Sequence, residues 1–81
     1  MQCEVLYVVM DNEKELKQLG EKFAKARESL GLSQTEFANS IGKDQPSINR
    51  LEKGKINPSY IYLLEVCKGL KMKLSELLES F

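Results

Sequence analysis

The sequence predicts an all-α domain of five helices behind a short strand-like segment at the N-terminus. Apolar residues recur at steps of three and four over most of the chain, which is the period of a helix with one buried face. Residues that favour helix starts and stops (Ser, Asp, Pro and Gly) interrupt this pattern at intervals. With 81 residues in total, the chain is expected to form one domain around one small core.

Residues 1–10 differ from the rest because they are rich in Val and Tyr and end at Asp11 and Asn12, a turn or cap pair. This composition predicts a short β-strand. A lone strand leaves its N–H and C=O groups unpaired, so we expect it to pair with its copy in a second subunit. The alternatives are disorder or a start of translation at Met10. Residues 1–12 are therefore treated as an extension, and residues 13–81 as the domain.

Three helices are expected in the first part of this domain. The first covers residues 13–30 and is followed by Gly31, a candidate left-handed C-cap. The second covers residues 34–41, because Ser33 and Glu36 have the spacing of a capping box. The third covers residues 45–53, with Asp44 as its N-cap and Pro46 in its first turn, where a missing N–H costs nothing.

Two more helices complete the chain. A fourth begins after Ser59 and ends near Gly69, and its pattern leaves the inward face open between two sets, Ile61, Leu64 and Cys67 or Leu63 and Val66. A short fifth helix runs from residue 74 to residue 81. Such a helix cannot bury all its apolar residues in one domain, so part of it is a candidate dimer seam. Its four apolar residues are Leu74, Leu77, Leu78 and Phe81.

Composition narrows the classes of function. The 12 basic and 12 acidic residues balance, and there is no His, the usual general base and the commonest metal ligand. Two thiols, Cys3 and Cys67, cannot build a zinc site without His. No catalytic site, metal or cofactor is therefore expected. The apolar run over residues 5–10 is too short to span a bilayer and lacks the flanks of a signal peptide, so a cytoplasmic protein without membrane contact is expected.

The two short helices over residues 34–53 are joined by a tight turn that contains Gly42, the pattern of a helix-turn-helix. Around them the chain resembles the Cro/cI family of repressors, also called xenobiotic-response-element-like regulators. The likeness covers about residues 16–81. The motifs that carry it are Leu32-Ser33-Gln34-Thr35-Glu36-Phe37-Ala38, Ile41-Gly42, Gln45-x-x-Ile48-x-Arg50-Leu51-Glu52-x-Gly54, Asn57-Pro58-Ser59 and Leu70-x-x-x-Leu74-Ser75-Glu76-Leu77-Leu78.

This resemblance implies a five-helix, lambda-repressor-like fold and a transcriptional regulator, a repressor, that binds a double-stranded DNA operator as a homodimer. It implies that Gln34 contacts a phosphate and, as in several members, supports the Gln that opens the recognition helix, here Gln45. Gln can bond adenine and Arg can bond guanine, so Gln45 and Arg50 are expected to read bases in the major groove. The full set of candidate DNA contacts is Ser33, Gln34, Lys43, Gln45, Ser47, Asn49, Arg50, Lys53, Lys55 and Asn57.

Two further positions and two departures from the family pattern complete the interpretation. Arg27 and Glu52 occupy positions that often form a structural ion pair in the family. Pro46 stands where most members carry a polar side chain, and Lys73 stands where the last helix usually has a Ser or Asp cap. The polar face of the third helix could instead be merely solvated. The rival functions are an antitoxin-type or partner-binding module with the same fold, and a small enzyme, which the absence of His disfavours.

Overall fold

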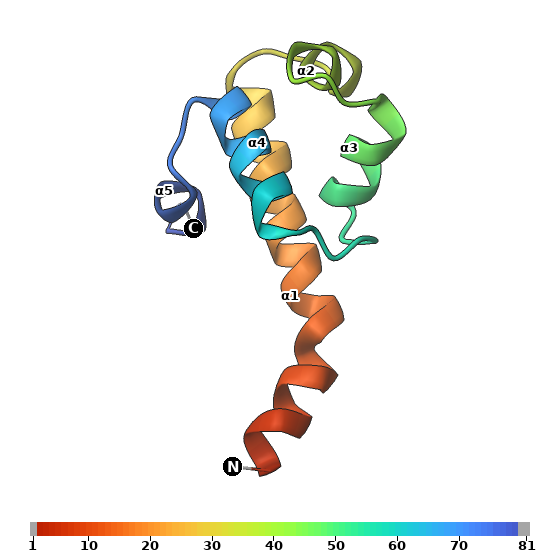
Figure 1. Cartoon of the computed structure of the whole chain (residues 1–81), viewed down its shortest axis with the longest axis vertical. Helices are drawn as coiled ribbons and strands as arrows, with labels where there is room; N and C mark the ends of the chain where they lie inside the picture. The colour runs from red at the N-terminus through yellow and green to blue at the C-terminus, as the bar shows by residue number, and fades with distance from the viewer. Residues whose placement is uncertain (1, 80–81) are drawn as a thin grey trace.

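The computed structural model describes residues 2–79, and the side chains of residues 13–79. Its elements are α1 (Gln2–Ser29), α2 (Gln34–Ser40), α3 (Gln45–Glu52), α4 (Tyr60–Leu70) and α5 (Leu74–Leu78). Figure 1 shows α4 lying alongside the C-terminal half of α1, with α2 and α3 on one side of this pair and α5 on the other. The described residues contain no strand, and the predicted all-α fold of five helices is confirmed.

The strand predicted over residues 1–10 is wrong, because residues 2–10 form the first turns of α1. Strand preference of Val and Tyr depends on neighbouring strands, and the described residues supply none. A strand without a partner leaves its backbone groups unpaired, whereas extending an existing helix adds one hydrogen bond per residue without a new nucleus. The pairing of this segment with its copy as a strand is therefore also withdrawn.

Side-chain caps begin three of the helices, two of them as the sequence predicted. Ser33 Oγ accepts from the N–H of Glu36 (3.0 Å) and Glu36 Oε1 accepts from the N–H of Ser33 (2.8 Å), the two halves of a capping box. Asp44 begins α3, as predicted, and Ser59 begins α4, and each accepts from the backbone N–H of the third residue of its helix. At the end of α1, Gly31 has a φ of 74°, as expected of a left-handed cap.

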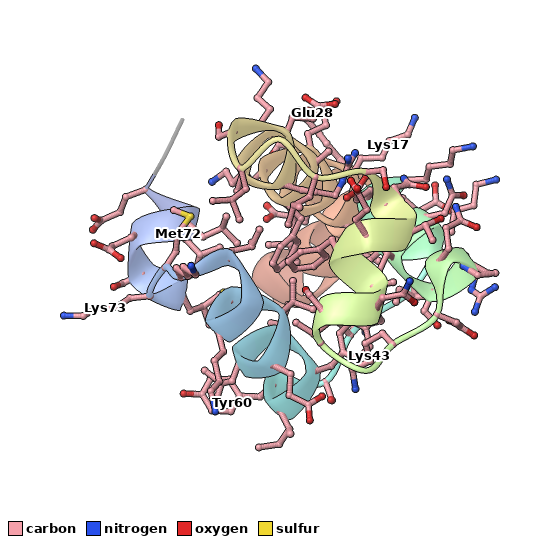
Figure 2. All side chains as sticks on the ribbon, turned by 90° about the horizontal axis from the view of Figure 1, so that it is seen from above. Lys17, Glu28, Lys43, Tyr60, Met72 and Lys73 are labelled. Atoms are coloured by element: carbon pink, nitrogen blue, oxygen red, sulfur yellow. The ribbon has the colours of Figure 1, made fainter. Side chains whose placement is uncertain are left out.

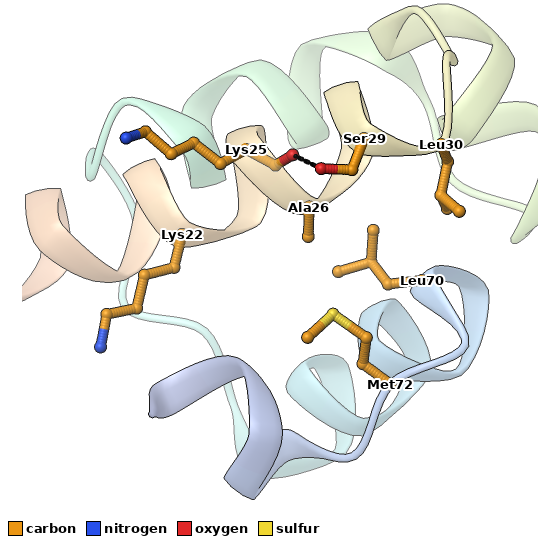
Figure 3. A pocket seen from close by; sticks show the side chains of 7 residues that line it. All are labelled: Lys22, Lys25, Ala26, Ser29, Leu30, Leu70 and Met72. Carbon is orange, nitrogen blue, oxygen red and sulfur yellow. Dashed lines mark hydrogen bonds between the residues drawn. The ribbon is translucent and has the colours of Figure 1, made fainter. Parts of the chain in front are cut away.

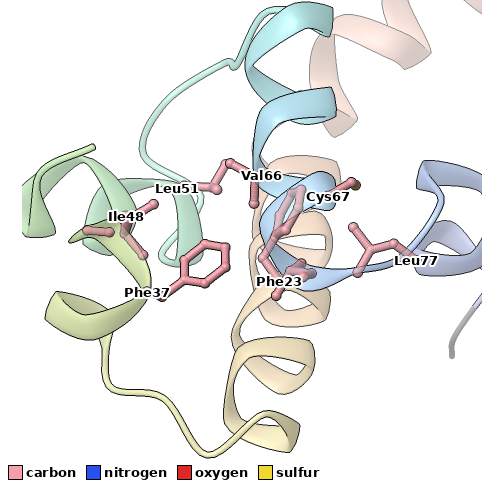
Figure 4. Close-up of a cluster of buried hydrophobic side chains, with 9 residues drawn as sticks. Phe23, Phe37, Ile48, Leu51, Val66, Cys67 and Leu77 are labelled. Atoms are coloured by element: carbon pink, nitrogen blue, oxygen red, sulfur yellow. The ribbon is translucent and has the colours of Figure 1, made fainter. Parts of the chain in front are cut away.

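All five helices contribute to one core, which Figure 4 shows in close-up. On α4 the second predicted inward set is confirmed, because Val66 is buried and Leu63 packs against the core, whereas the first set is right only for Cys67. Val66 and Cys67 are buried together with Leu70, while Ile61 and Leu64 are exposed. The buried hydrophobic residues are Phe23 on α1, Phe37 and Ala38 on α2, Ile48 and Leu51 on α3, Val66, Cys67 and Leu70 on α4, and Leu77 on α5.

The described chain after α4 packs on the core through Leu77, which is buried, and through Met72 and Leu74, which are partly buried. Lys71, with a φ of 60°, ends α4 one residue later than predicted, and α5 begins at Leu74. Leu77 is fully buried, whereas Leu78 is 47% exposed, so α5 offers an apolar side chain to solvent as predicted for a dimer seam. Residues 80–81, which we expected to continue this helix, lie outside the described residues. No helix in the described part of the chain is long and apolar enough to cross a membrane.

Candidate nucleic-acid interface

Two glycines allow α1 to lie directly against the end of α3. A Cβ on Gly20 would collide with the backbone carbonyl groups of Leu51 and Glu52. Gly54 follows α3 with a φ of 72°, and a Cβ there would come within 2.7 Å of the backbone of Lys17. Only glycine satisfies both the left-handed conformation and the close approach at this position. The close approaches at Gly20 and Gly54 therefore fix the orientation of α3 relative to α1.

An ion pair lies next to this contact. Arg27 Nε donates to Glu52 Oε2 (2.7 Å) and Arg27 Nη2 donates to Glu52 Oε1 (3.0 Å), while Nη1 donates to the carbonyl oxygen of Leu32 (2.7 Å). The side chains of Arg27 and Glu52 are only 11% and 6% exposed. The hydrogen bond to Glu52 raises the already high pKa of Arg27. The guanidinium therefore ties together α1, the loop before α2 and the end of α3.

Gln34, at the start of α2, connects this pair to the outer face of α3. Its Nε2 donates to Glu52 Oε1 (2.8 Å), and its Oε1 accepts from Gln45 Nε2 (2.7 Å) and from Asn49 Nδ2 (3.2 Å). All four side chains in this network are partly buried. The network therefore gathers three of the predicted site residues, Gln34, Gln45 and Asn49, at the junction of α2 and α3.

A second group of predicted site residues is exposed around the end of α3. Arg50 lies on α3, and Lys53, Lys55 and Asn57 follow it, all with exposed side chains. Lys53, Lys55 and Asn57 line a groove of about 520 Å³ between the loop after α3 and the middle of α1. The other lining residues are Glu13, Leu16, Lys17, Gly54 and Ile56.

Lys17 is a basic residue of this groove that the sequence analysis did not single out. It lies on α1, 37 positions before Gly54, which it approaches in space. No local pattern in the sequence marks it, because its place beside Lys53 and Lys55 arises only from the packing of α1 on α3. Three lysines from two segments therefore meet around one groove.

Lys43 does not join either group. Its ammonium lies 2.7 Å from Glu65 Oε1 and 5.1 Å from the centre of the Tyr62 ring, both on α4. The hydrogen bond with Glu65 raises the pKa of Lys43. Figure 2 shows Lys17 and Lys43 on different sides of the molecule. The ammonium of Lys43 is thus engaged by α4 rather than turned toward the face of α3.

The remaining predicted residues lie at the first turns of α2 and α3. Ser33 is exposed, and its hydroxyl is used by the capping box. Ser47 is half-buried and gives its backbone N–H to Asp44 Oδ1 (3.0 Å). Hydrogen bonds from Ser47, first from the side chain and then from the backbone, lower the pKa of Asp44. Asp44 therefore stays ionised at the N-terminus of α3.

Another hollow, of about 490 Å³, lies away from these residues (Figure 3). It opens between α1 and the chain that follows α4, with an apolar floor and two lysines at its edge. None of its lining residues comes from α2 or α3. They are Lys22, Lys25, Ala26, Ser29, Leu30, Leu70 and Met72. Within the described residues, no cluster of three or more His, Cys, Asp or Glu could hold a metal ion.

Comparison with known proteins agrees with this geometry. The family model described as helix-turn-helix matches residues 23–77, which include α2, α3 and the whole polar network. The chain belongs to the helix-turn-helix family of Cro/cI-type transcriptional regulators. It is 36% identical over 61 residues to the uncharacterized HTH-type transcriptional regulator y4dJ of Sinorhizobium fredii, a match that covers 75% of this chain and 79% of that protein.

Similar solved structures support the same fold. The restriction-modification controller protein C.AhdI from Aeromonas hydrophila superposes with a TM-score of 0.78 and 28% identity, over 83% of this chain and 97% of that one. The clp gene regulator ClgR from C. glutamicum has a TM-score of 0.74 and 24% identity, over 76% of this chain and 80% of that one. At this identity the second likeness concerns the fold alone.

Proposed function

We propose that this protein is a transcriptional regulator, a repressor, that binds a specific double-stranded DNA site as a homodimer with α3 in the major groove. The observation that carries the proposal is the network in which Gln34 holds Gln45 and Asn49 on the outer face of α3. Polar side chains held at the start and middle of a recognition helix are suited to base edges. Membership of a family of HTH-type regulators supports the same function.

The proposed contacts divide into base contacts and phosphate contacts. Gln45 and Arg50 read bases, because a carboxamide matches adenine and a guanidinium matches guanine, and Asn49, held beside Gln45 by Gln34, belongs to the same base-facing set. Phosphates are held by side chains at the helix ends and around the groove after α3, which fix the register of the protein on the duplex without reading its sequence. This second set consists of Ser33, Gln34, Ser47, Lys53, Lys55 and Asn57, and we add Lys17.

Charge distribution supports DNA binding despite the balanced total. Lys17, Lys53 and Lys55 surround one groove at the end of α3, and phosphates respond to charge within about a Debye length, roughly 8–10 Å. Lys43 is left out of the phosphate set because its ammonium is paired with Glu65. The neutral net charge of the chain therefore does not weigh against a local contact with the DNA backbone.

The homodimer is supported by apolar side chains that α4 and α5 leave exposed. On α4, Tyr60, Ile61 and Leu64 share one face and are 65%, 63% and 38% exposed, and Leu78 on α5 is 47% exposed. Exposed apolar surface of this kind is typical of an interaction site. We further propose that residues 13–81 form the binding domain, that residues 1–12 are an extension, and that the protein acts in the cytoplasm and is not an enzyme.

Selection of bound sequences from a pool of random duplexes tests this function. We expect enrichment of a two-fold symmetric site whose half-sites are separated by about 10–10.5 base pairs or a multiple of this distance. A Gln45→Ala/Arg50→Ala variant is the control and should select no site. If the wild-type protein enriches no sequence even at low salt, the function proposed for α3 is wrong, and the same fold acts through protein partners instead.

A further inference from the structure

Glu52 accepts three of the hydrogen bonds in the polar network and cannot donate any. Its Oε1 accepts from Arg27 Nη2 (3.0 Å) and from Gln34 Nε2 (2.8 Å), and its Oε2 accepts from Arg27 Nε (2.7 Å). An ionised carboxylate has acceptor sites only. The atom of Gln34 that faces Glu52 must therefore be the nitrogen, and the orientation of the Gln34 amide follows from the charge beside it.

The orientation of the Gln34 amide determines the orientation of the Gln45 and Asn49 amides. With its nitrogen turned to Glu52, Gln34 directs its carbonyl oxygen toward α3, where it accepts from Gln45 Nε2 (2.7 Å) and Asn49 Nδ2 (3.2 Å). The amide nitrogens of Gln45 and Asn49 thus face inward. In the described part of the chain no donor occupies their carbonyl oxygens, and each nitrogen keeps a second N–H.

We propose that Glu52 is a positioning residue that determines base specificity by setting the direction of these three amides. Because of Glu52, α3 presents the carbonyl oxygens of Gln45 and Asn49 together with one N–H each. This arrangement selects bases that offer an exocyclic amino group in the major groove, adenine or cytosine, over the keto bases guanine and thymine. The inference rests on the proposed function, and it specifies which amide atoms of the base-reading side chains face the bases.

The chemistry of base edges gives this selection its direction. Adenine offers its N6 amino donor beside the N7 acceptor, which matches the carbonyl oxygen and free N–H of Gln45. Guanine offers only the acceptors N7 and O6, so its O6 would face the carbonyl oxygen of Gln45. Discrimination by one such side chain corresponds to about a tenfold difference in affinity or more.

The ion pair with Arg27 fixes the position of the Glu52 side chain. Arg27 is itself anchored by the carbonyl oxygen of Leu32 (2.7 Å), and both charged side chains are largely shielded from solvent. Arg27 therefore supports the orientation of Glu52. The oxygen that accepts from Gln34, however, is an atom of Glu52.

Two single variants separate the effect of amide direction from the effect of stability. Glu52→Gln removes the ion pair and gives position 52 a donor, so Gln34 is free to turn its oxygen toward it and reverse the direction of Gln45 and Asn49. Arg27→Gln removes the same ion pair but leaves the carboxylate of Glu52 facing Gln34. A loss of stability alone would affect both variants alike, and both are assayed at a temperature at which they are folded by circular dichroism.

The double variant Glu52→Gln/Gln34→Glu provides a rescue. Its position 52 donates to a carboxylate at position 34, which again offers only acceptors to Gln45 and Asn49. The direction of these two amides is then that of the wild-type protein, although the charge has moved. Because position 34 is also a proposed phosphate contact, a carboxylate there lowers the affinity for every duplex, so the readout is the ratio of affinities for the two duplexes. If Glu52 acts through amide direction, the double variant should recover the base preference. If Glu52 had a purely structural role, this recovery would not be expected.

Affinities are measured for duplexes that carry A·T or G·C at the position contacted by Gln45, located by selection with the wild-type protein. We expect a preference of about tenfold for adenine in the wild type, Arg27→Gln and the double variant, and of about twofold or less in Glu52→Gln. An unchanged preference in Glu52→Gln, or an equal loss in Arg27→Gln, overturns the inference. If Glu52→Gln does not fold, Gln34→Met, which retains the ion pair, must show the same loss.

Side-chain amide signals in ¹⁵N–¹H NMR spectra of the free protein provide a readout that does not need DNA. The signals of Gln45 and Asn49 should move in Glu52→Gln and stay in place in Arg27→Gln. If the wild type binds no duplex, the proposed function fails and these spectra decide the role of Glu52 alone. If the wild type selects a site while Glu52→Gln keeps both its signals and its preference, only the inference fails.

Discussion

Arg27 and Glu52 meet through two nearly parallel hydrogen bonds, from Nε to Oε2 at 2.7 Å and from Nη2 to Oε1 at 3.0 Å. Such a fork is the strong form of a charge-assisted contact. The two residues are 25 positions apart, and the bond joins α1 to the last residue of α3. Because their side chains are only 11% and 6% exposed, either charge would be poorly solvated without its partner.

We therefore expect Arg27→Met to lower the free energy of unfolding by about 3–5 kcal/mol, the usual cost of breaking a buried pair. Chemical denaturation monitored by circular dichroism measures this change. The control is Glu65→Gln, which breaks the more exposed pair with Lys43 and should leave stability nearly unchanged. A loss below about 1 kcal/mol for Arg27→Met would show that the pair behaves like an exposed one.

Gly20 provides a test of how closely α1 packs on α3. Ala favours a helix over Gly by about 1 kcal/mol, but a Cβ at Gly20 would collide with the backbone carbonyls of Leu51 and Glu52. Overpacking of this kind costs about 1–3 kcal/mol or more, so Gly20→Ala should lower the melting temperature. Gln18→Ala, an exposed position on the same helix, should leave it nearly unchanged. A rise with Gly20→Ala would contradict the close approach.

Stability should fall at alkaline pH. Burial raises the pKa of the Cys67 thiol above its ordinary value of 9.0, and desolvation raises the pKa of Tyr62. The unfolded chain then releases these protons at a lower pH than the folded chain, so stability is complete below about pH 9 and declines above it. Urea denaturation at several values between pH 7.5 and pH 10 should show a shallower decline for Cys67→Ala. Equal slopes for this variant and the wild type would refute the assignment.

The first turn of α5 lacks the side-chain acceptor that caps α2, α3 and α4. Lys73 precedes α5 without a side-chain cap, although its N–H donates to Glu76 Oε1 (2.8 Å). Lys73→Ser would complete the capping box and should raise the free energy of unfolding by about 1 kcal/mol. Lys68→Ser, on the exposed side of α4, is a control that gains no cap. No gain for Lys73→Ser would mean that α5 contributes little to the folded state.

The features that were predicted from the sequence depend on neighbours a few residues apart. The capping box of Ser33 and Glu36 and the cap at Asp44 follow from local spacing. The strand over residues 1–10 was predicted wrongly because Val and Tyr favour strands only where a partner exists. Local sequence preference therefore predicted where helices start, but it did not predict whether residues 1–10 form a strand or a helix.

The features that could not be predicted depend on tertiary packing. Periodicity left two possible inward faces on α4, and contact with the other helices buried Val66 and Cys67 and exposed Leu64. Gly20 and Lys17 acquire their roles only because α1 lies against the end of α3. The resemblance to the family supplied the candidate residues, whereas the hydrogen bonds that link Gln34 to Glu52 required coordinates.

The central claim, that α3 reads bases while lysines beside it hold phosphates, is tested by titrating the wild type, Arg50→Ala and Lys55→Ala against cognate and scrambled duplexes at several salt concentrations. Arg50→Ala should cost about 1–3 kcal/mol on the cognate duplex only. Lys55→Ala should weaken binding to both duplexes alike and reduce the salt slope by about one. Equal losses on both duplexes for Arg50→Ala, or no binding by the wild type at low salt, would contradict the claim.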